Sequence, residues 1–279
     1  MNFVYEVFER LLPFSFMQYD FMKNALIAVL IITPLFGMLG TMIVNNKMAF
    51  FSDALGHSAF TGIAIGVIFG FADLNVTMVL FAIVFALLLN RIKRRNAVST
   101  DTIISVFSSL GSAIGLVVLS QNGNFSKYSS ILVGDILSIT PAEIGWLLLI
   151  FVVAMIFFGT CFNQLHSMSI NVSLANSKGI RIKLLDDIFA VMIAMIIMLS
   201  IRWVGILMIN ALLILPAAAA RNLAENVREY HGFSVVISMF SGILGLLVSY
   251  FVNTATGPTI IIIASAVFFL TLLTKPLVK

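Results

Sequence analysis

Apolar windows without a charged residue follow one another along nearly the whole chain, and they constrain the fold more than any other feature. Only 10% of the 279 residues are charged, whereas a soluble domain carries about 25%. The mean hydropathy is +1.11. One water-facing core cannot hide this much apolar surface, so the bilayer must act as solvent. The sequence therefore predicts an all-α, multi-pass protein of the cell (inner or cytoplasmic) membrane, with one transmembrane domain over residues 1–279.

The positions of the charges predict where the spans lie. A helix needs about 20 apolar residues to cross a bilayer. The window between residues 229 and 275 is too long for one helix, and the turn signal at Asn253–Pro258 divides it in two. The predicted spans, eight or nine in number, lie within 24–46, 54–72, 74–90, 101–127, 143–163, 187–202, 202–221 and, twice, 229–275.

The basic residues predict the orientation, because Lys and Arg collect in cytoplasmic loops. If the basic loop 91–95 is cytoplasmic, alternation puts most of the 16 basic residues on that side and leaves Arg10, Lys23, Lys127 and Arg202 outside. This predicts an external N-terminus and a cytoplasmic C-terminus. Residues 1–20 are predicted to form an interfacial helix rather than a cleavable signal. If they cross instead, the N-terminus lies inside.

Two ionisable residues, Asp53 and His57, interrupt the apolar pattern of the second span. Their i, i+4 spacing places both side chains on one helix face. Ionisable groups at membrane depth are costly and usually mark a pathway or a binding site. An imidazole nitrogen beside a carboxylate suits Mn²⁺, Fe²⁺ or Zn²⁺. The alternative is structural, with Asp53 at a helix N-terminus and His57 packed in the bundle.

Four further residues are candidates for the pathway or its gate. Asn210 is polar at membrane depth and more often makes an interhelical hydrogen bond than a metal contact. Pro216 is expected to kink its span, and the alanines at 217–220 allow close helix packing. Asp135, in the external loop, is either a solvated charge or part of an outer vestibule. Asp101 begins the fourth span.

The polar connector at 163–183 is the longest predicted cytoplasmic loop. Residues 172–178 can form a short helix that ends at Gly179, a favourable residue after a helix C-terminus. A short exposed helix between two spans is where a motor subunit would grip, although the spacing also fits an ordinary loop.

Several functions lack support in the sequence. A phosphate-cradling Gly-x-x-x-x-Gly-Lys-Ser/Thr motif is missing, and so is His-Glu-x-x-His, so neither an ATP site of that type nor a zinc protease is indicated. The single cysteine, Cys161, lies in an apolar run and is expected to pack there. The basic residues are explained by topology rather than by nucleic acid. We therefore expect a non-enzymatic protein.

Two segments together resemble the metal-ion permease family of ATP-binding-cassette importers, the zinc, manganese and iron type. They are Asp53-Ala-Leu-Gly-His57 and Leu215-Pro-Ala-Ala-Ala-Ala-Arg221. The resemblance extends over about residues 20–275. Further matching segments lie at 21–26, 37–41, 101–102, 134–137, 204–214 and 256–260. One departure is Gly56, where the family pattern leads us to expect Ser.

The resemblance implies a permease similar to type II importers, working as a homodimer with an ATP-binding-cassette ATPase dimer and an external metal-binding protein. It implies that Asp53 and His57 line the path of a transported Zn²⁺, Mn²⁺ or Fe²⁺ ion, with no permanently bound cofactor, and that the partner chain hydrolyses ATP. It also implies a coupling helix made by Leu174, Ala175, Asn176, Lys178 and Gly179.

A two-fold dimer would bring two Asp–His pairs to a shared axis and supply four metal ligands. ATP binding in the partner subunits would then switch the permease between outward and inward openings. Two alternatives stay open at this point. One is a secondary transporter with Asp53, Asp101 or Asp187 as proton carriers, and the other is a siderophore- or cobalamin-type permease.

Overall fold

The computed structural model describes residues 18–71, 74–94, 100–121 and 125–278, and no strand occurs in these ranges. The all-α prediction is confirmed. The prediction for residues 1–20 lies almost entirely outside the described residues. The helices, in chain order, are α2 (Asp20–Asn45), α3 (Ala49–Phe69), α4 (Leu74–Lys93), α5 (Thr100–Gln121), α6 (Phe125–Tyr128), η2 (Ser129–Leu132), η3 (Ile136–Ser138), α7 (Pro141–Ile170), α8 (Val172–Ser177), α9 (Ile182–Val204), α10 (Ile206–Leu223), α11 (Val227–Val252) and α12 (Thr256–Val278).

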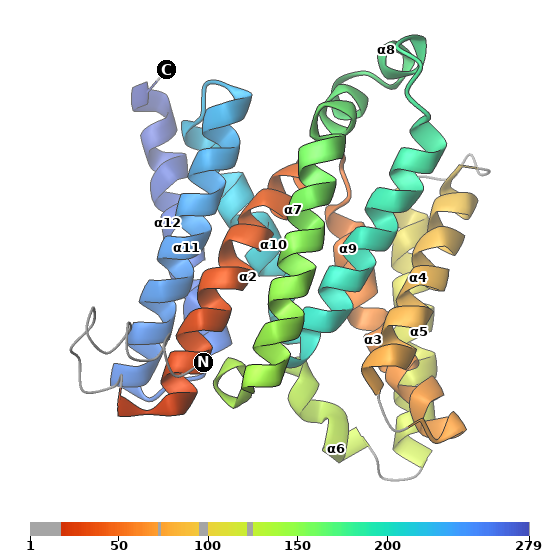
Figure 1. The fold of residues 1–279 in the computed structure, drawn as a ribbon, viewed down its shortest axis with the longest axis vertical. Helices are drawn as coiled ribbons and strands as arrows, with labels where there is room; N and C mark the ends of the chain where they lie inside the picture. Colours follow the sequence, from red (N-terminus) through yellow and green to blue (C-terminus); the bar gives the residue numbers. More distant parts are fainter. Residues whose placement is uncertain (1–17, 72–73, 95–99, 122–124, 279) are drawn as a thin grey trace.

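The long helices form one bundle and run between its two ends (Figure 1). Eight of the described helices are long and apolar enough to cross a membrane, and α10 is a shorter apolar helix beside them. The charge-free windows located these helices to within a few residues at most of their ends. The predicted break in the last window is confirmed at Asn253, whose positive φ of 56° ends α11.

Two helix boundaries differ from the sequence prediction. α7 continues to Ile170, past Asn163, where the sequence suggested the start of a polar connector. Leu165 and Met168 are buried, and their packing keeps this last part helical. α9 begins at Ile182, before Asp187, the charge that bounds its predicted window. The segment that connects the end of α7 to the start of α9 is therefore shorter than the predicted connector at 163–183.

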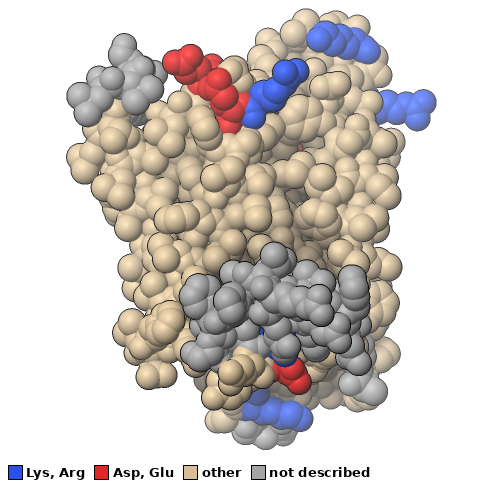
Figure 2. All heavy atoms as spheres, turned by 60° about the vertical axis from the view of Figure 1, so that its left-hand side comes forward, with Lys and Arg blue, Asp and Glu red and all other residues tan. Residues whose placement is uncertain are grey.

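On the face shown in Figure 2, charged side chains gather near the upper and lower ends of the bundle, and uncharged residues lie between them. In Figure 1 the upper end carries α8 and the C-terminus, while α6 lies at the lower end. α2 begins at the lower end and α12 finishes at the upper one, so the two ends of the described chain lie on opposite sides. This arrangement matches a bundle that spans a bilayer.

α2 and α10 approach each other closely in the core. A Cβ atom on Gly40 would lie 1.9 Å from the carbonyl oxygen of Leu213, so only glycine fits here. The alanines Ala217, Ala219 and Ala220 are fully buried. The predicted close packing of this alanine run is confirmed.

A tight backbone crossing marks the break between α9 and α10. Gly205 ends α9 with a φ of 91°, and Gly134, with a φ of 71°, lies directly against it. A Cβ atom on Gly205 would meet the carbonyl oxygen of Val133 at 2.3 Å. Both positions therefore require glycine. The loop before η3 is thus fixed against the start of α10.

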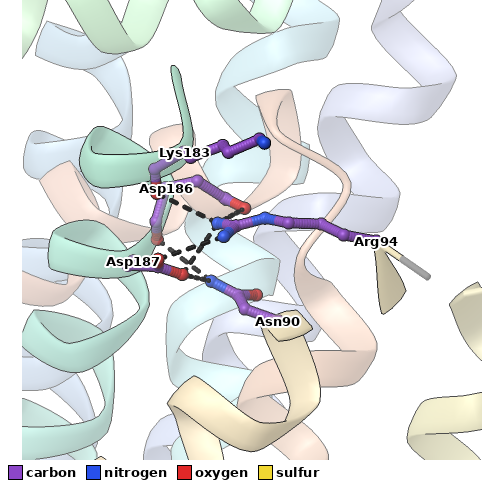
Figure 3. A network of polar contacts seen from close by, with 5 residues as sticks. All are labelled: Asn90, Arg94, Lys183, Asp186 and Asp187. Atoms are coloured by element: carbon purple, nitrogen blue, oxygen red, sulfur yellow. Dashed lines mark hydrogen bonds and ion pairs between the residues drawn. The ribbon is translucent and has the colours of Figure 1, made fainter. Parts of the chain in front are cut away.

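A polar network joins the end of α4 to the start of α9 (Figure 3). The Arg94 guanidinium donates to both carboxylate oxygens of Asp187, at 3.0 and 2.7 Å, and to Asp186 at 3.0 Å. Asn90 Nδ2 adds a 3.1 Å hydrogen bond to Asp187. Partial burial works against the charged guanidinium, but the hydrogen bonds and charges of Asp187 and Asp186 prevail and raise the pKa of Arg94.

Candidate functional site

Asp53 and His57 lie on one face of α3, as the sequence predicts. Asp53 Oδ1 is 3.7 Å from His57 Nε2, and each side chain is 41% exposed. Their neighbours on the helix, Ala54, Leu55 and Ser58, are buried. The pair is therefore only partly covered by the described helices and faces open space on one side of α3.

α5 crosses α3 beside this pair at very short distance. A Cβ atom on Gly115 would lie 2.5 Å from the backbone of Phe60 and Thr61, and one on Gly111 would lie 2.9 Å from Ser58 Cβ. The Thr61 hydroxyl donates to the carbonyl oxygen of Gly111. The sequence signal is Gly111-Ser-Ala-Ile-Gly115, the small-residue spacing that lets membrane helices approach closely, a signal that the pattern of charges does not reveal.

This crossing places a row of hydroxyl groups opposite the pair. A cavity of about 370 Å³ is lined by Asp53 and His57 from α3 and by four serines of α5. One of the serines, Ser112, donates to the backbone carbonyl oxygen of His57 at 3.2 Å. The four serines are Ser105, Ser108, Ser109 and Ser112. Their spacing of i, i+3, i+4 and i+7 places them on one face of α5.

Asn210 of α10 reaches the pair from the other side. Its Nδ2 donates to Asp53 Oδ1 at 3.3 Å, and its Oδ1 accepts from the Ser52 hydroxyl at 2.8 Å. The expectation that Asn210 makes an interhelical hydrogen bond is confirmed. The sequence could not identify the partner, because residues 53 and 210 meet only through the packing of α3 against α10.

The other pathway candidates lie elsewhere. Asp101 is exposed in the first turn of α5 and does not line the cavity. Asp135 is exposed and caps η3, where its carboxylate accepts from Leu137 N at 3.0 Å. Pro216 is buried inside α10. The structure therefore brings together Asp53, His57 and Asn210, and it does not bring the remaining three to them.

The predicted short helix between the spans is present as α8 (Figure 1). Asn171 caps its start by accepting from Leu174 N at 3.1 Å, and Gly179, with a φ of 75°, follows its end. Ala175 is buried, whereas Leu174 is 49% exposed. α8 therefore packs against the bundle on the side of Ala175 and exposes the apolar side chain of Leu174.

The site offers two metal-binding side chains in one chain. Two ligands that each lie about 2.1 Å from a metal ion are at most about 4.2 Å apart, so the 3.7 Å separation of Asp53 Oδ1 and His57 Nε2 allows one shared ion. Among the described residues, no group of three or more His, Cys, Asp or Glu side chains gathers where it would hold a metal. A site that binds a metal ion more tightly therefore needs ligands in addition to Asp53 and His57 of one chain.

Residues 18–275 match the model of the ABC 3 transport family. The zinc uptake membrane protein ZnuB of Haemophilus influenzae is 31% identical over 91% of this chain and 97% of its own length. The manganese import permease ScaB of Streptococcus parasanguinis is 28% identical over 91% of this chain and 90% of its own. The chain therefore belongs to the ABC 3 transport family.

Solved structures agree on the fold. A chain of PsaBC from Streptococcus pneumoniae, solved in complex with Fab, superposes with a TM-score of 0.80 at 24% identity, over 97% of this chain and 95% of its own. An inward-facing metal-chelate type transporter gives a TM-score of 0.71 at 13% identity, over 90% of this chain and 85% of its own. The overall fold of this chain is thus one that these two solved structures share.

Proposed function

We propose that this chain is the membrane permease subunit of an ATP-driven importer of divalent transition-metal ions, Zn²⁺, Mn²⁺ or Fe²⁺. The observation that carries the proposal is the cavity on α3, where Asp53 and His57 face open space at membrane depth beside four serines. Relatives named as zinc and manganese permeases, over nearly the full length of the chain, support the same substrate class.

The proposal includes a second copy of the chain. One copy supplies one carboxylate and one imidazole, which make a weak site. A two-fold axis near the exposed face of α3 would add an equal pair and give four ligands. Moderate binding suits a transported ion, because an ion that is held too tightly cannot leave.

The remaining partners follow from the two ends of the bundle. An ATPase dimer would dock at α8 and the C-terminal end, which the distribution of basic residues predicts to be cytoplasmic. This chain contains no phosphate-cradling motif of its own, so the partner would hydrolyse ATP. An external metal-binding protein would deliver the ion at the opposite end.

The structure gives Asp187, one of the candidate proton carriers of a secondary transporter, a structural role. Asp187 is paired with Arg94 and hydrogen-bonded by Asn90. This carboxylate is engaged in the contact between α4 and α9 and does not line the cavity of Asp53 and His57.

The test is ATP-dependent uptake of Zn²⁺, Mn²⁺ and Fe²⁺ into proteoliposomes that contain the whole complex. We expect uptake of at least one of these metals by the wild type and its loss in Asp53→Asn and in His57→Ala. Glu225→Gln is the matched control, since it removes one exposed negative charge between α10 and α11, away from the cavity; because this loop lies at the end where the ATPase is proposed to dock, co-purification of the ATPase establishes that the variant is still assembled. It should transport like the wild type.

Two outcomes would contradict the proposal in different ways. Normal uptake in both site variants would move the path away from Asp53 and His57. No metal uptake by an assembled complex that hydrolyses ATP would reject the metal substrate, and uptake of a siderophore or cobalamin in its place would identify the other class of permease.

A further inference from the structure

Asn210 is the one side chain of α10 that forms a described hydrogen bond to the Asp53 carboxylate. Its amide is engaged at both ends with neighbouring residues of α3, Ser52 and Asp53. Asn210 and Asp53 are only partly buried, whereas Ser52 is fully buried. This contact therefore lies at the border between the packed interior and the cavity.

The chemistry of the three groups fixes the orientation of the amide. A carboxylate only accepts hydrogen bonds, so the Asn210 NH₂ group must be the end that faces Asp53. The Asn210 carbonyl then faces Ser52, whose hydroxyl must donate to it. The Ser52 hydroxyl also lies 2.8 Å from the carbonyl oxygen of Ala49, and its single proton serves one of the two acceptors at a time.

The oxygen that Asn210 contacts is the one that faces His57. Asp53 Oδ1 lies 3.3 Å from Asn210 Nδ2 and 3.7 Å from His57 Nε2. The neutral amide of Asn210 therefore holds the Asp53 carboxylate in place by a hydrogen bond. The resulting distance between Asp53 Oδ1 and His57 Nε2 leaves room for an ion. Without this donor, the Asp53 carboxylate would be free to move onto the His57 imidazole. The contact between the two side chains would then compete with binding of the ion.

We propose that Asn210 is a positioning residue of the metal path, which aims the Asp53 carboxylate and keeps the Asp53–His57 pair open for the ion. The inference rests on the proposed function, because it assumes that Asp53 and His57 bind the ion. Hydrogen bonds from outside orient metal-binding carboxylates in many proteins, and their removal commonly lowers metal affinity about 10- to 100-fold.

The experiment measures initial rates of uptake against metal concentration in the reconstituted complex, with the metal that the wild type transports. Asn210→Leu removes the donor at similar size, and we expect the half-saturating metal concentration to rise about 10-fold with most of the maximal rate retained. Asn210→Asp keeps the size and adds an oxygen ligand. We expect it to lower the maximal rate without raising the half-saturating concentration, because the ion is held more tightly.

The matched control is Asn222→Leu on the same helix. Asn222 Nδ2 donates to Thr271 Oγ1 of α12 at 3.2 Å, so this variant also deletes an interhelical hydrogen bond of α10 but lies away from the cavity. It should leave the half-saturating metal concentration unchanged. Thermal unfolding and co-purification of the ATPase would establish that each variant is folded and assembled.

The outcomes separate the inference from the function on which it rests. If Asp53→Asn abolishes uptake but Asn210→Leu behaves like Asn222→Leu, or if Asn210→Leu and Asn210→Asp have the same effect, the positioning role is wrong and the proposed function stands. If Asp53→Asn transports metal like the wild type, the path does not depend on Asp53 and the positioning role is wrong, while the importer function stands; only the absence of metal uptake by the assembled wild-type complex would reject both. If Asn210→Leu cannot be assembled, a rise in the half-saturating concentration in Asn210→Asp would overturn the inference, and the expected fall in maximal rate would support it.

Discussion

At the residue scale, two glycines of α3 have different surroundings, so substitutions at these positions test how closely α3 packs against its neighbours. A Cβ atom on Gly56 would find its nearest neighbours at 3.6 Å, in ordinary contact with Ile206 and Ile209. A Cβ atom on Gly62 would lie 2.9 Å from Met78 Cα of α4. Packing therefore demands glycine at 62 and leaves room for a side chain at 56, the position where the family pattern led us to expect Ser.

We predict that Gly56→Ala raises the thermal stability of the protein and that Gly62→Ala lowers it. Glycine inside a helix costs about 0.5–1 kcal/mol relative to alanine, and nothing at Gly56 opposes that gain. At Gly62 the backbone of α4 would have to move, at a cost of about 1–3 kcal/mol. Unfolding in detergent measures both variants. Equal shifts in the two would contradict this account of the packing.

The residues of the site were only partly predictable from the sequence. Asp53 and His57 stood out because a charge is rare in an apolar span. The α5 serines did not, since a hydroxyl in a membrane helix usually bonds to its own backbone, as Ser58 and Ser120 do. Their role as a cavity wall depends on the crossing of α5 over α3, which follows from Gly111 and Gly115 only once the partner helix is known.

At the scale of elements, the Arg94 network is the main polar fastening between α4 and α9 (Figure 3). Since α4 packs on α3 and α9 begins just after α8, the network lies between the candidate docking helix and the helix of the site. The sequence predicted the basic loop but not these partners. Asp186 and Asp187 are more than 90 residues away in the chain.

We predict that Arg94→Ala destabilises the protein by about 1–3 kcal/mol, because it leaves two adjacent, partly buried carboxylates without their donor. Arg94→Lys should recover only part of this loss, since an ammonium cannot bond both oxygens of Asp187 as a planar fork does. Arg91→Ala removes an exposed charge from the same helix end and serves as control. If it destabilises as much as Arg94→Ala, general charge and not this network is responsible.

For the whole molecule, the sequence located the spans because a charge inside a membrane span is costly and rare, so that most charges lie near the ends of the bundle, as on the face shown in Figure 2. It located α8 for a second reason. Gly179, after a short polar run, is the residue that best tolerates the positive φ of 75° found there. The extension of α7 to Ile170 was not predictable, because it depends on the burial of Leu165 and Met168 against other helices.

The last prediction concerns assembly with the proposed ATPase. α8 exposes about half of Leu174 at the end of the bundle that carries the C-terminus (Figure 1). We expect Leu174→Asp to reduce co-purification of the ATPase and ATP-dependent uptake together, since a charge would enter an apolar contact, while the permease keeps its thermal stability. Val133→Asp replaces an exposed apolar residue at the opposite end and should keep the ATPase bound. An ATPase that remains bound to Leu174→Asp would place its docking surface elsewhere than α8.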